Sequence, residues 1–401
     1  MAEDYPKGMM WRGSVRSGCS TFFTEDSIRK SDIRFHPPIR FLAFLLLLYL
    51  FFVSITMMGT AFKFFGRGFA ETLLQTTSSP FLSLFVGILA TSLVQSSSTV
   101  TSITVGLVAA GGLTIDGAIS IVMGANIGTS ITNTLVASGH IYNKEEFRRA
   151  FATSTVHDFF NVLAVIILFP LQLSTDFLGK ASSYIAAEFK GIGGLELANP
   201  LQHIVKPAVS ATVSVVGESG VILLLLSLLL LFVSLRYIVV NLKALVVGKI
   251  EAFFDKTLFK TGLRAFVVGI ILTVLVQSSS ITTSLVVPLA GAGILTLNQI
   301  FPFTLGANIG TTITAMLAAL VTGQVAAVTV AFAHLLFNIS GIVIIWPLKR
   351  IPIYLAETLA RLSLRSKIIP FLYIGVVFFL IPLVLIYLME WSNMPCLSSR
   401  S

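Results

Sequence analysis

Four consecutive polar residues, Gln-Ser-Ser-Ser, stand inside apolar sequence at positions 95–98 and again at 277–280. Each copy is followed 29 positions later by Gly-Ala-Asn-Ile-Gly-Thr, at 124–129 and 306–311. The side chains are neutral amides and hydroxyls. Their oxygens can coordinate a hard cation such as Na⁺, and their hydrogens, with backbone N–H groups at a helix start, can donate to an oxyanion. The motifs therefore indicate ion binding.

The two copies belong to an internal duplication. Residues 87–137, laid on 269–319 without a gap, share 27 identities in 51 positions, and both motifs recur at an offset of 182. A single run of serines in a membrane helix more often serves packing, and the small residues around each Asn could serve close helix approach alone. Recurrence of the amide, the serines and the Asn at one offset favours a functional use of both copies.

A second recurrence pairs a His with an Asn four residues later. The two pairs stand at an offset of 177. Within each pair the His and the Asn are four residues apart, so they lie on one helical face. Such a pair either serves a site or forms an interhelical hydrogen bond. We assign the structural, interhelical role to His157, Asn161, His334 and Asn338.

Asp158 has no acidic counterpart, because the matching residue in the second copy is Leu335. A carboxylate in or near a membrane segment is a functional-site hypothesis by default. A cation ligand is its simplest role.

Composition defines the elements that position these residues. Of 401 residues, 55% are hydrophobic and 11% are charged, and apolar blocks recur along the chain. An integral membrane protein is therefore predicted, and helices are the expected spanning element because the blocks exceed 18 residues without strand-like alternation. The net charge of +9 comes from Lys and Arg between apolar blocks, which is typical of membrane topology and not of nucleic-acid binding. The two cysteines lie in opposite tails, which excludes a disulfide framework.

Five regions follow in order. They are a cytoplasmic N-terminal tail (1–40), membrane repeat 1 (41–171), an extracellular connection (172–218), membrane repeat 2 (219–348), and a basic connection with a closing helix and short tail (349–401). Within repeat 1 we expect a first span over 41–58, followed by an interfacial or partly inserted half-helix over 61–80.

The charge of the connections predicts opposite orientations for the two repeats. Repeat 1 begins inside and ends outside, whereas repeat 2 begins outside and ends inside. Each repeat offers four apolar blocks but needs an odd number of crossings, so at least one block must enter and leave on one side. We predict two inverted-topology repeats with broken or re-entrant helices meeting near the midplane, an architecture typical of ion-coupled transporters and not of enzymes.

The buried polar groups also suggest how transport is driven. An oxyanion held without Arg or Lys in a low-dielectric site is poorly compensated. A bound Na⁺ would supply the missing positive charge, which makes symport an electrostatic consequence. The chain has no Walker A sequence, so ATP is not the evident energy source.

These motifs carry a resemblance to a known family. LVQSSS, GANIGTS with ITNT, the stretch FRRAFATSTVHDFFN (147–161) and GANIGTT resemble the type II sodium-dependent phosphate cotransporters, most of all the short bacterial-type members. The resemblance covers roughly 41–171 and 219–348. It implies that the two Gln-Ser-Ser-Ser copies form a substrate and sodium region between inverted repeats.

The resemblance and the residue chemistry together give the predicted site. For phosphate these residues are Gln95, Ser96, Ser97, Gln277, Ser278 and Ser279. For sodium they are Ser98, Ser280, Asn126, Thr129, Asn308, Thr311 and Asp158. Electrogenic relatives carry an Asp at the position of Asp158, with Ala at two upstream positions where this chain has Ala152 and Ser154.

The predicted function is a multi-pass symporter of the plasma (cell inner) membrane that imports inorganic phosphate with Na⁺, electrogenically. No cofactor is expected beyond Na⁺ as coupling ion, the partners are phosphate, Na⁺ and membrane lipid without nucleic acid, and the oligomeric state stays open. Alternatives are a phosphate exporter of the same fold, a passive channel with glycine-rich filter segments, or a non-transporting membrane scaffold.

Overall fold

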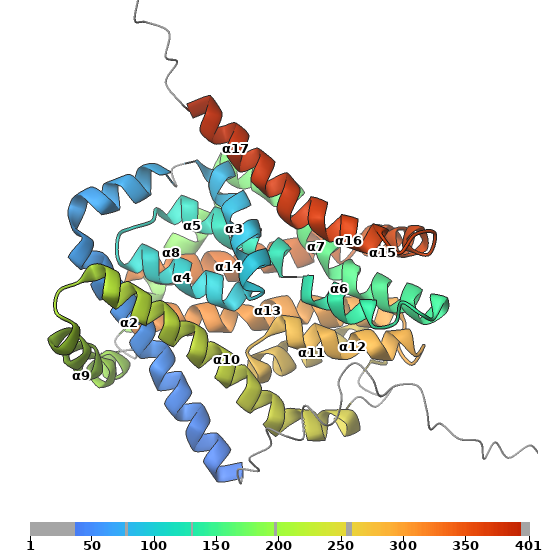
Figure 1. The fold of residues 1–401 in the computed structure, drawn as a ribbon, viewed down its shortest axis with the longest axis horizontal. Helices are drawn as coiled ribbons and strands as arrows, with labels where there is room; N and C mark the ends of the chain where they lie inside the picture. The colour runs from blue at the N-terminus through green and yellow to red at the C-terminus, as the bar shows by residue number, and fades with distance from the viewer. Residues whose placement is uncertain (1–36, 77–78, 130, 196–198, 254–258, 394–401) are drawn as a thin grey trace, which may run out of the picture.

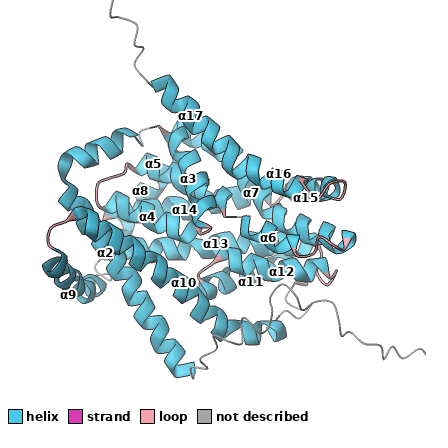
Figure 2. Cartoon of the chain, viewed as in Figure 1, coloured by secondary structure: helices cyan, strands magenta, loops and turns pink. Residues whose placement is uncertain are grey.

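The computed structural model describes residues 37–76, 79–129, 131–195, 199–253 and 259–393, so the predicted tail 1–40 lies almost wholly outside the described residues. Within those ranges the chain consists of helices and loops, without a strand (Figure 2). Seven described stretches are long and apolar enough to cross a membrane: Ile39–Phe65, Ile115–Ser138, Lys144–Thr175, Gly220–Asn241, Leu297–Thr322, Val325–Ile345 and Ile369–Met389. This confirms the all-α membrane protein that composition predicts.

The helices follow one another along the chain as labelled in Figure 1. The first half contains α2 (Pro37–Thr76), α3 (Pro80–Val94), α4 (Ser97–Ala109), α5 (Ile115–Gly128), α6 (Ile131–Ser138), α7 (Lys144–Thr175), α8 (Phe177–Gly191) and α9 (Asn199–Val216). The second half contains α10 (Gly220–Phe253), α11 (Gly262–Val276), α12 (Ser279–Gly291), α13 (Leu297–Thr322), α14 (Val325–Ile345) and α15 (Arg350–Ser363). The closing segment is α16 (Ile369–Ile374), a π-helical stretch (Gly375–Leu380) and α17 (Ile381–Asn393).

Two stretches of the chain form more regular elements than the sequence alone indicates. The predicted span 41–58 and residues 61–76 of the half-helix expected over 61–80 are continuous in one helix, α2. The connection 172–218 is largely helical, because its apolar residues recur at helical spacing and form α8 and α9.

The helix-to-helix contacts follow the same pattern in both halves. α3 packs on α5, and α11 packs on α13. The helix after each His–Asn helix packs on the other half: α8 contacts α14, and α15 contacts α7.

Burial separates inner helices from outer ones. In the most apolar 18 residues of each stretch, the buried share is 82% for Ile115–Ser138 and 72% for Leu297–Thr322. It is only 33% for Gly220–Asn241 and 17% for Ile369–Met389. The outer two expose rows of large apolar side chains, as a lipid-facing helix does. The two Gly-Ala-Asn-Ile-Gly-Thr motifs are therefore carried by the most buried of these four stretches.

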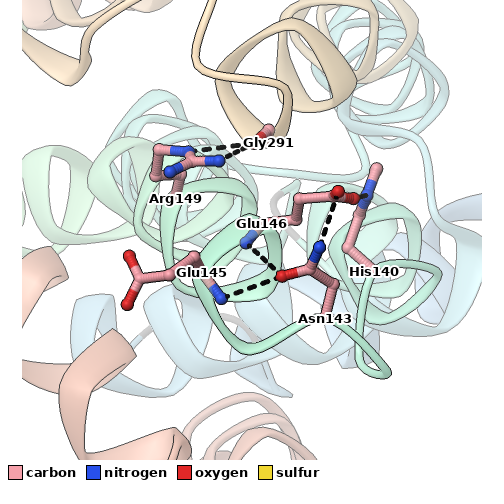
Figure 3. Close-up of polar contacts among 6 residues, drawn as sticks. All are labelled: His140, Asn143, Glu145, Glu146, Arg149 and Gly291. Atoms are coloured by element: carbon pink, nitrogen blue, oxygen red, sulfur yellow. Dashed lines mark hydrogen bonds and ion pairs between the residues drawn. The ribbon is translucent and has the colours of Figure 1, made fainter. Parts of the chain in front are cut away.

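A polar connection holds the start of α7 against the end of α12 (Figure 3). Asn143 caps α7 by accepting from the backbone N–H groups of Glu145 (3.2 Å) and Glu146 (3.4 Å). Arg149 donates from Nε and Nη2 to the carbonyl oxygen of Gly291, at 2.9 and 2.7 Å. A guanidinium is favourable at a helix C-terminus, so Arg149 joins the two halves at this end of the molecule.

Candidate substrate and ion site

Each Gln-Ser-Ser-Ser motif interrupts a helix. Gln95 ends α3 with φ of 58°, and Gln277 ends α11 with φ of 55°, both left-handed. This conformation costs a residue with a Cβ about 1–2 kcal/mol. The strain recurs at equivalent positions, so the break is a built feature of both copies.

The Gln side chains are held in the same way at both breaks. Gln95 Nε2 donates to a carbonyl in its own helix, and its Oε1 accepts from Thr132 Oγ1 at 3.0 Å. Gln277 does the same, and its Oε1 accepts from Thr314 Oγ1 at 2.7 Å. Each break is thereby fixed to a threonine three residues beyond the Gly-Ala-Asn-Ile-Gly-Thr segment of its own repeat.

The serines begin the next helix. Ser96 and Ser278 are the N-caps of α4 and α12, and each accepts from a backbone N–H three residues on. Ser97, Ser98 and Ser279 are buried, and their hydroxyls make no hydrogen bond to a described residue. The remaining first-turn N–H groups and the free hydroxyl groups at each break can together hold an oxyanion.

Short helix α6 connects the first break to the second repeat. Thr132, next in sequence to Asn133, donates a hydrogen bond to the side-chain oxygen of Gln95. Asn133 Nδ2 donates to Thr283 Oγ1 at 2.8 Å, and its Oδ1 accepts from Ser284 Oγ at 2.9 Å. The first break and α12, which follows the second break, are therefore linked through Thr132 and Asn133, neighbouring residues of α6.

Ser280 adds a second link between the repeats. Its hydroxyl donates to the backbone carbonyl of Thr129 at 3.3 Å. The Thr129 and Thr311 hydroxyls each donate to the carbonyl four residues earlier, at 2.9 and 3.0 Å. Their lone pairs remain available to a cation.

The glycines of the Asn motifs bring helices close together. A Cβ on Gly124 would collide with the backbone of α3, and a Cβ on Gly306 would collide with the backbone of α11. Gly128 and Gly310 are also crowded by the same helices. These glycines have the packing role, and the Asn between them supplies the polar group.

Asn308 lies in a buried network that crosses the repeats. Its Oδ1 pairs with His157 Nε2 at 2.5 Å, and its Nδ2 donates to Asn161 Oδ1 at 2.8 Å. Asn161 Nδ2 donates in turn to the backbone carbonyl of Asn126 at 2.8 Å. The side-chain amide of Asn126 donates only within its own helix, to Val122 O at 2.9 Å.

The second His–Asn pair is buried without such partners. His334 and Asn338 are each 1% exposed. Neither ring nitrogen of His334, nor Asn338 Oδ1, has a hydrogen-bond partner among the described residues. Asn338 Nδ2 donates back to the carbonyl of His334 at 3.1 Å. Buried polar groups left in this way are rare in proteins.

Asp158 is fully buried and faces the closing segment. Its Oδ2 accepts from the hydroxyl of Tyr373 at 3.1 Å. His157, one residue earlier, faces the second repeat. Neighbouring positions of α7 thus connect to two different parts of the molecule.

Sequence reasoning missed several residues of this region. Thr132 and Thr314 are separated by the repeat offset of 182, so the duplication already contained their signal. Thr91 and Thr273 are separated by the same offset, and their hydroxyls are buried one turn before each break without a hydrogen-bond partner among the described residues. Asn133 had no such signal, because its counterpart is Ala315.

The helices and the breaks define a multi-pass membrane protein whose two breaks carry neutral polar side chains suited to ions. The sequence profile of the Na⁺/Pi-cotransporter family matches residues 50–196 and 230–345, and the chain belongs to this family. This confirms the family predicted from the motifs.

Two relatives give the scale of the similarity. Sodium-dependent phosphate transport protein 2B of Homo sapiens is 34% identical over 435 residues, which cover 84% of this chain and 63% of that protein. Sodium-dependent phosphate transport protein 2A of Rattus norvegicus is 34% identical over 415 residues, covering 84% of this chain and 65% of that protein. The chain thus spans somewhat less than two thirds of their length. No solved structure matches it.

Proposed function

We propose that this protein is a secondary symporter that imports inorganic phosphate together with Na⁺. The observation that carries the proposal is the pair of equivalent helix breaks, each with an amide, at least one free hydroxyl and first-turn N–H groups. The relatives named as sodium-dependent phosphate transport proteins supply the identity of the ions.

In this proposal the breaks hold phosphate and sodium together. Phosphate takes the Gln side chains and the first two serines of each motif. Sodium takes the oxygens of the third serines, Ser98 and Ser280, and of the following Asn–Thr motifs. The described hydrogen-bond partners of both breaks are uncharged. An anion there is stabilised by bound Na⁺, which couples the two fluxes.

Asp158 adds the charge that makes the cycle electrogenic. It is a buried carboxylate on the helix that carries His157, and it has no acidic counterpart in the second repeat. Its negative charge favours one further Na⁺, so a net positive charge enters with each cycle.

The repeats have inverted topology in this proposal, and their broken helices re-enter. The matching pattern of contacts in the two halves supports it, since α8 and α15 each cover the other half's His–Asn helix. The asymmetric pairs also fit alternating access. When the site opens to the other side, His334 and Asn338 acquire partners and His157 and Asn161 give theirs up.

We place the protein in the plasma membrane with a cytoplasmic N-terminus. The basic tail 1–40 and the basic residues around Arg149 then lie inside, as positive-inside topology requires. α9 lies at the opposite end of the molecule from α15 and faces outward in this orientation (Figure 1).

Uptake of radiolabelled phosphate into proteoliposomes tests the proposal. An inward NaCl gradient is compared with equal KCl or choline chloride, at zero and at inside-negative potential. The proposal predicts uptake that requires Na⁺ and rises with negative potential. Uptake that ignores Na⁺, by protein shown to be folded and inserted, would leave the channel or exporter instead.

A further inference from the structure

A cavity of about 660 Å³ lies between α2, α9, the end of α4 and the junction of α13 with α14. It is distinct from the breaks. Ala109, which lines it, is the last residue of α4, and Ser97 at the break is the first. Twelve helical steps separate them by about 18 Å.

One face of each of two helices forms the walls. Thr56, Thr60 and Lys63 line the cavity from α2 at spacings of four and three. Lys206 and Ser210 line it from α9, four residues apart. Helical spacing places each set on a single stripe, so both lysines belong to the same opening.

The cavity is positively charged. Among the described residues that line it are Lys63 and Lys206, and none of them is acidic. Neither lysine forms an ion pair within the described parts of the chain, where the ion pairs are those of His140 and Arg148 with nearby glutamates. Two ammonium groups facing one opening repel each other, and an anion between them relieves that repulsion.

Further donors stand beside the lysines. Ser210 and Gln324 line the cavity, are exposed, and have side chains without a hydrogen bond to a described residue. Thr56 and Thr60 donate their hydroxyl hydrogens to carbonyls of α2, at 3.1 Å each. The free donors are therefore two ammoniums, a hydroxyl and an amide, a set suited to a phosphate oxyanion.

We propose that this cavity captures a phosphate oxyanion at the outer face before the anion reaches the breaks. The inference rests on the proposed function for its direction, since the site precedes transport only if phosphate enters from that side. A phospholipid headgroup offers the same chemistry and is the other source of the ligand.

Separating the lysines from the breaks has a physical use. Fixed cations raise the local concentration of anions and their rate of arrival. At the breaks themselves a fixed cation would hold phosphate without Na⁺ and weaken coupling. Capture by Lys63 and Lys206 leaves the neutral breaks dependent on Na⁺.

Amine acylation tests binding without transport. The full-length protein, in phosphatidylcholine vesicles and potassium buffer free of Na⁺, is treated with an amine-reactive ester, and modified lysines are quantified by mass spectrometry. Potassium phosphate, compared with KCl at equal ionic strength, should slow acylation of Lys63 and Lys206 at least threefold. Lys190, an exposed lysine of α8, should be unaffected. Equal acylation of all three in phosphate and chloride overturns the proposal.

Vesicles containing phosphatidylglycerol identify the source. Slower acylation of Lys63 and Lys206 in these vesicles without added phosphate would support the oxyanion site with a lipid headgroup as its ligand. Slowing that requires inorganic phosphate would support capture of the substrate.

Transport kinetics tests the consequence. The double variant Lys63→Gln/Lys206→Gln should raise the KM for phosphate three- to tenfold, with the maximal rate within twofold of the parent. The shift should shrink when choline chloride raises ionic strength at constant Na⁺. Lys190→Gln should leave KM unchanged. An unchanged KM in the double variant overturns capture as a step in uptake. Failure of the parent protein to show Na⁺-driven uptake contradicts the symporter, while the acylation result still decides the site.

Discussion

The first His–Asn pair and the second have the same spacing on equivalent helices but opposite surroundings. His157 and Asn161 bond across the molecule to Asn308, whereas His334 has no partner among the described residues. The two Gln breaks, by contrast, are equivalent in dihedral angle and in partners. The halves thus share the broken-helix arrangement and differ in the contacts between them, as the proposed two-sided transporter would in one of its states.

The largest expected effect tests the equivalence of the breaks. Gln95→Ala and Gln277→Ala should each lower Na⁺-driven phosphate uptake about 100-fold, since each removes a proposed ion ligand and leaves a threonine unpaired, together worth about 3 kcal/mol. Gln299→Ala, at the exposed cap of α13, is the matched control and should change uptake less than twofold. A tenfold difference between the two break variants would show that the breaks are not equivalent.

Asp158 sharpens the contrast, because it is present in one half only. Asp158→Asn keeps an acceptor for Tyr373 and removes the charge. Uptake should still require Na⁺. One elementary charge is worth about 2.3 kcal/mol at −100 mV, so accumulation at −100 mV relative to 0 mV should be about 50-fold in the parent and near unity in the variant. Tyr373→Phe retains the carboxylate and should keep the voltage response. Voltage-dependent accumulation by Asp158→Asn would remove the carboxylate from charge coupling.

Asn308 and Asn126 are equivalent in sequence but not in bonding. Asn308→Ala should lower the free energy of unfolding by about 2 kcal/mol, because His157 and Asn161 both lose a buried partner. Asn126→Ala should lower the free energy of unfolding by less than half as much, since the Asn126 side chain donates only within its own helix. Thermal unfolding in detergent measures both, and equal losses would contradict the asymmetric network.

The smallest expected effect tests the unpartnered pair. His334→Leu should raise stability by about 1 kcal/mol, because it removes buried polar atoms that lack partners. Uptake should nevertheless fall severalfold if His334 acquires a partner in the other state. Asn338→Leu is a second variant for the same two measurements, stability and uptake, in case His334→Leu packs poorly. Raised stability with undiminished uptake would assign the pair no part in the cycle.

The sequence was sufficient to predict the helical membrane fold and its family, because apolar length and a duplicated polar motif both depend on local residues. It could not predict the Asn133 link, since Ala315 replaces the residue in the other copy, nor the contact of Asp158 with Tyr373, which lies outside the repeats. The unequal surroundings of His157 and His334 were also inaccessible. They depend on how the halves pack, and the His and the Asn are themselves the same in both copies.

The most direct test of the central claim is the reverse coupling: ²²Na⁺ entry into proteoliposomes driven by an inward phosphate gradient, with equal Na⁺ on both sides at the start. The symporter predicts net ²²Na⁺ accumulation that requires phosphate and is lost in the Gln95→Ala/Gln277→Ala double variant. Sodium entry that is indifferent to phosphate would contradict coupling at the breaks.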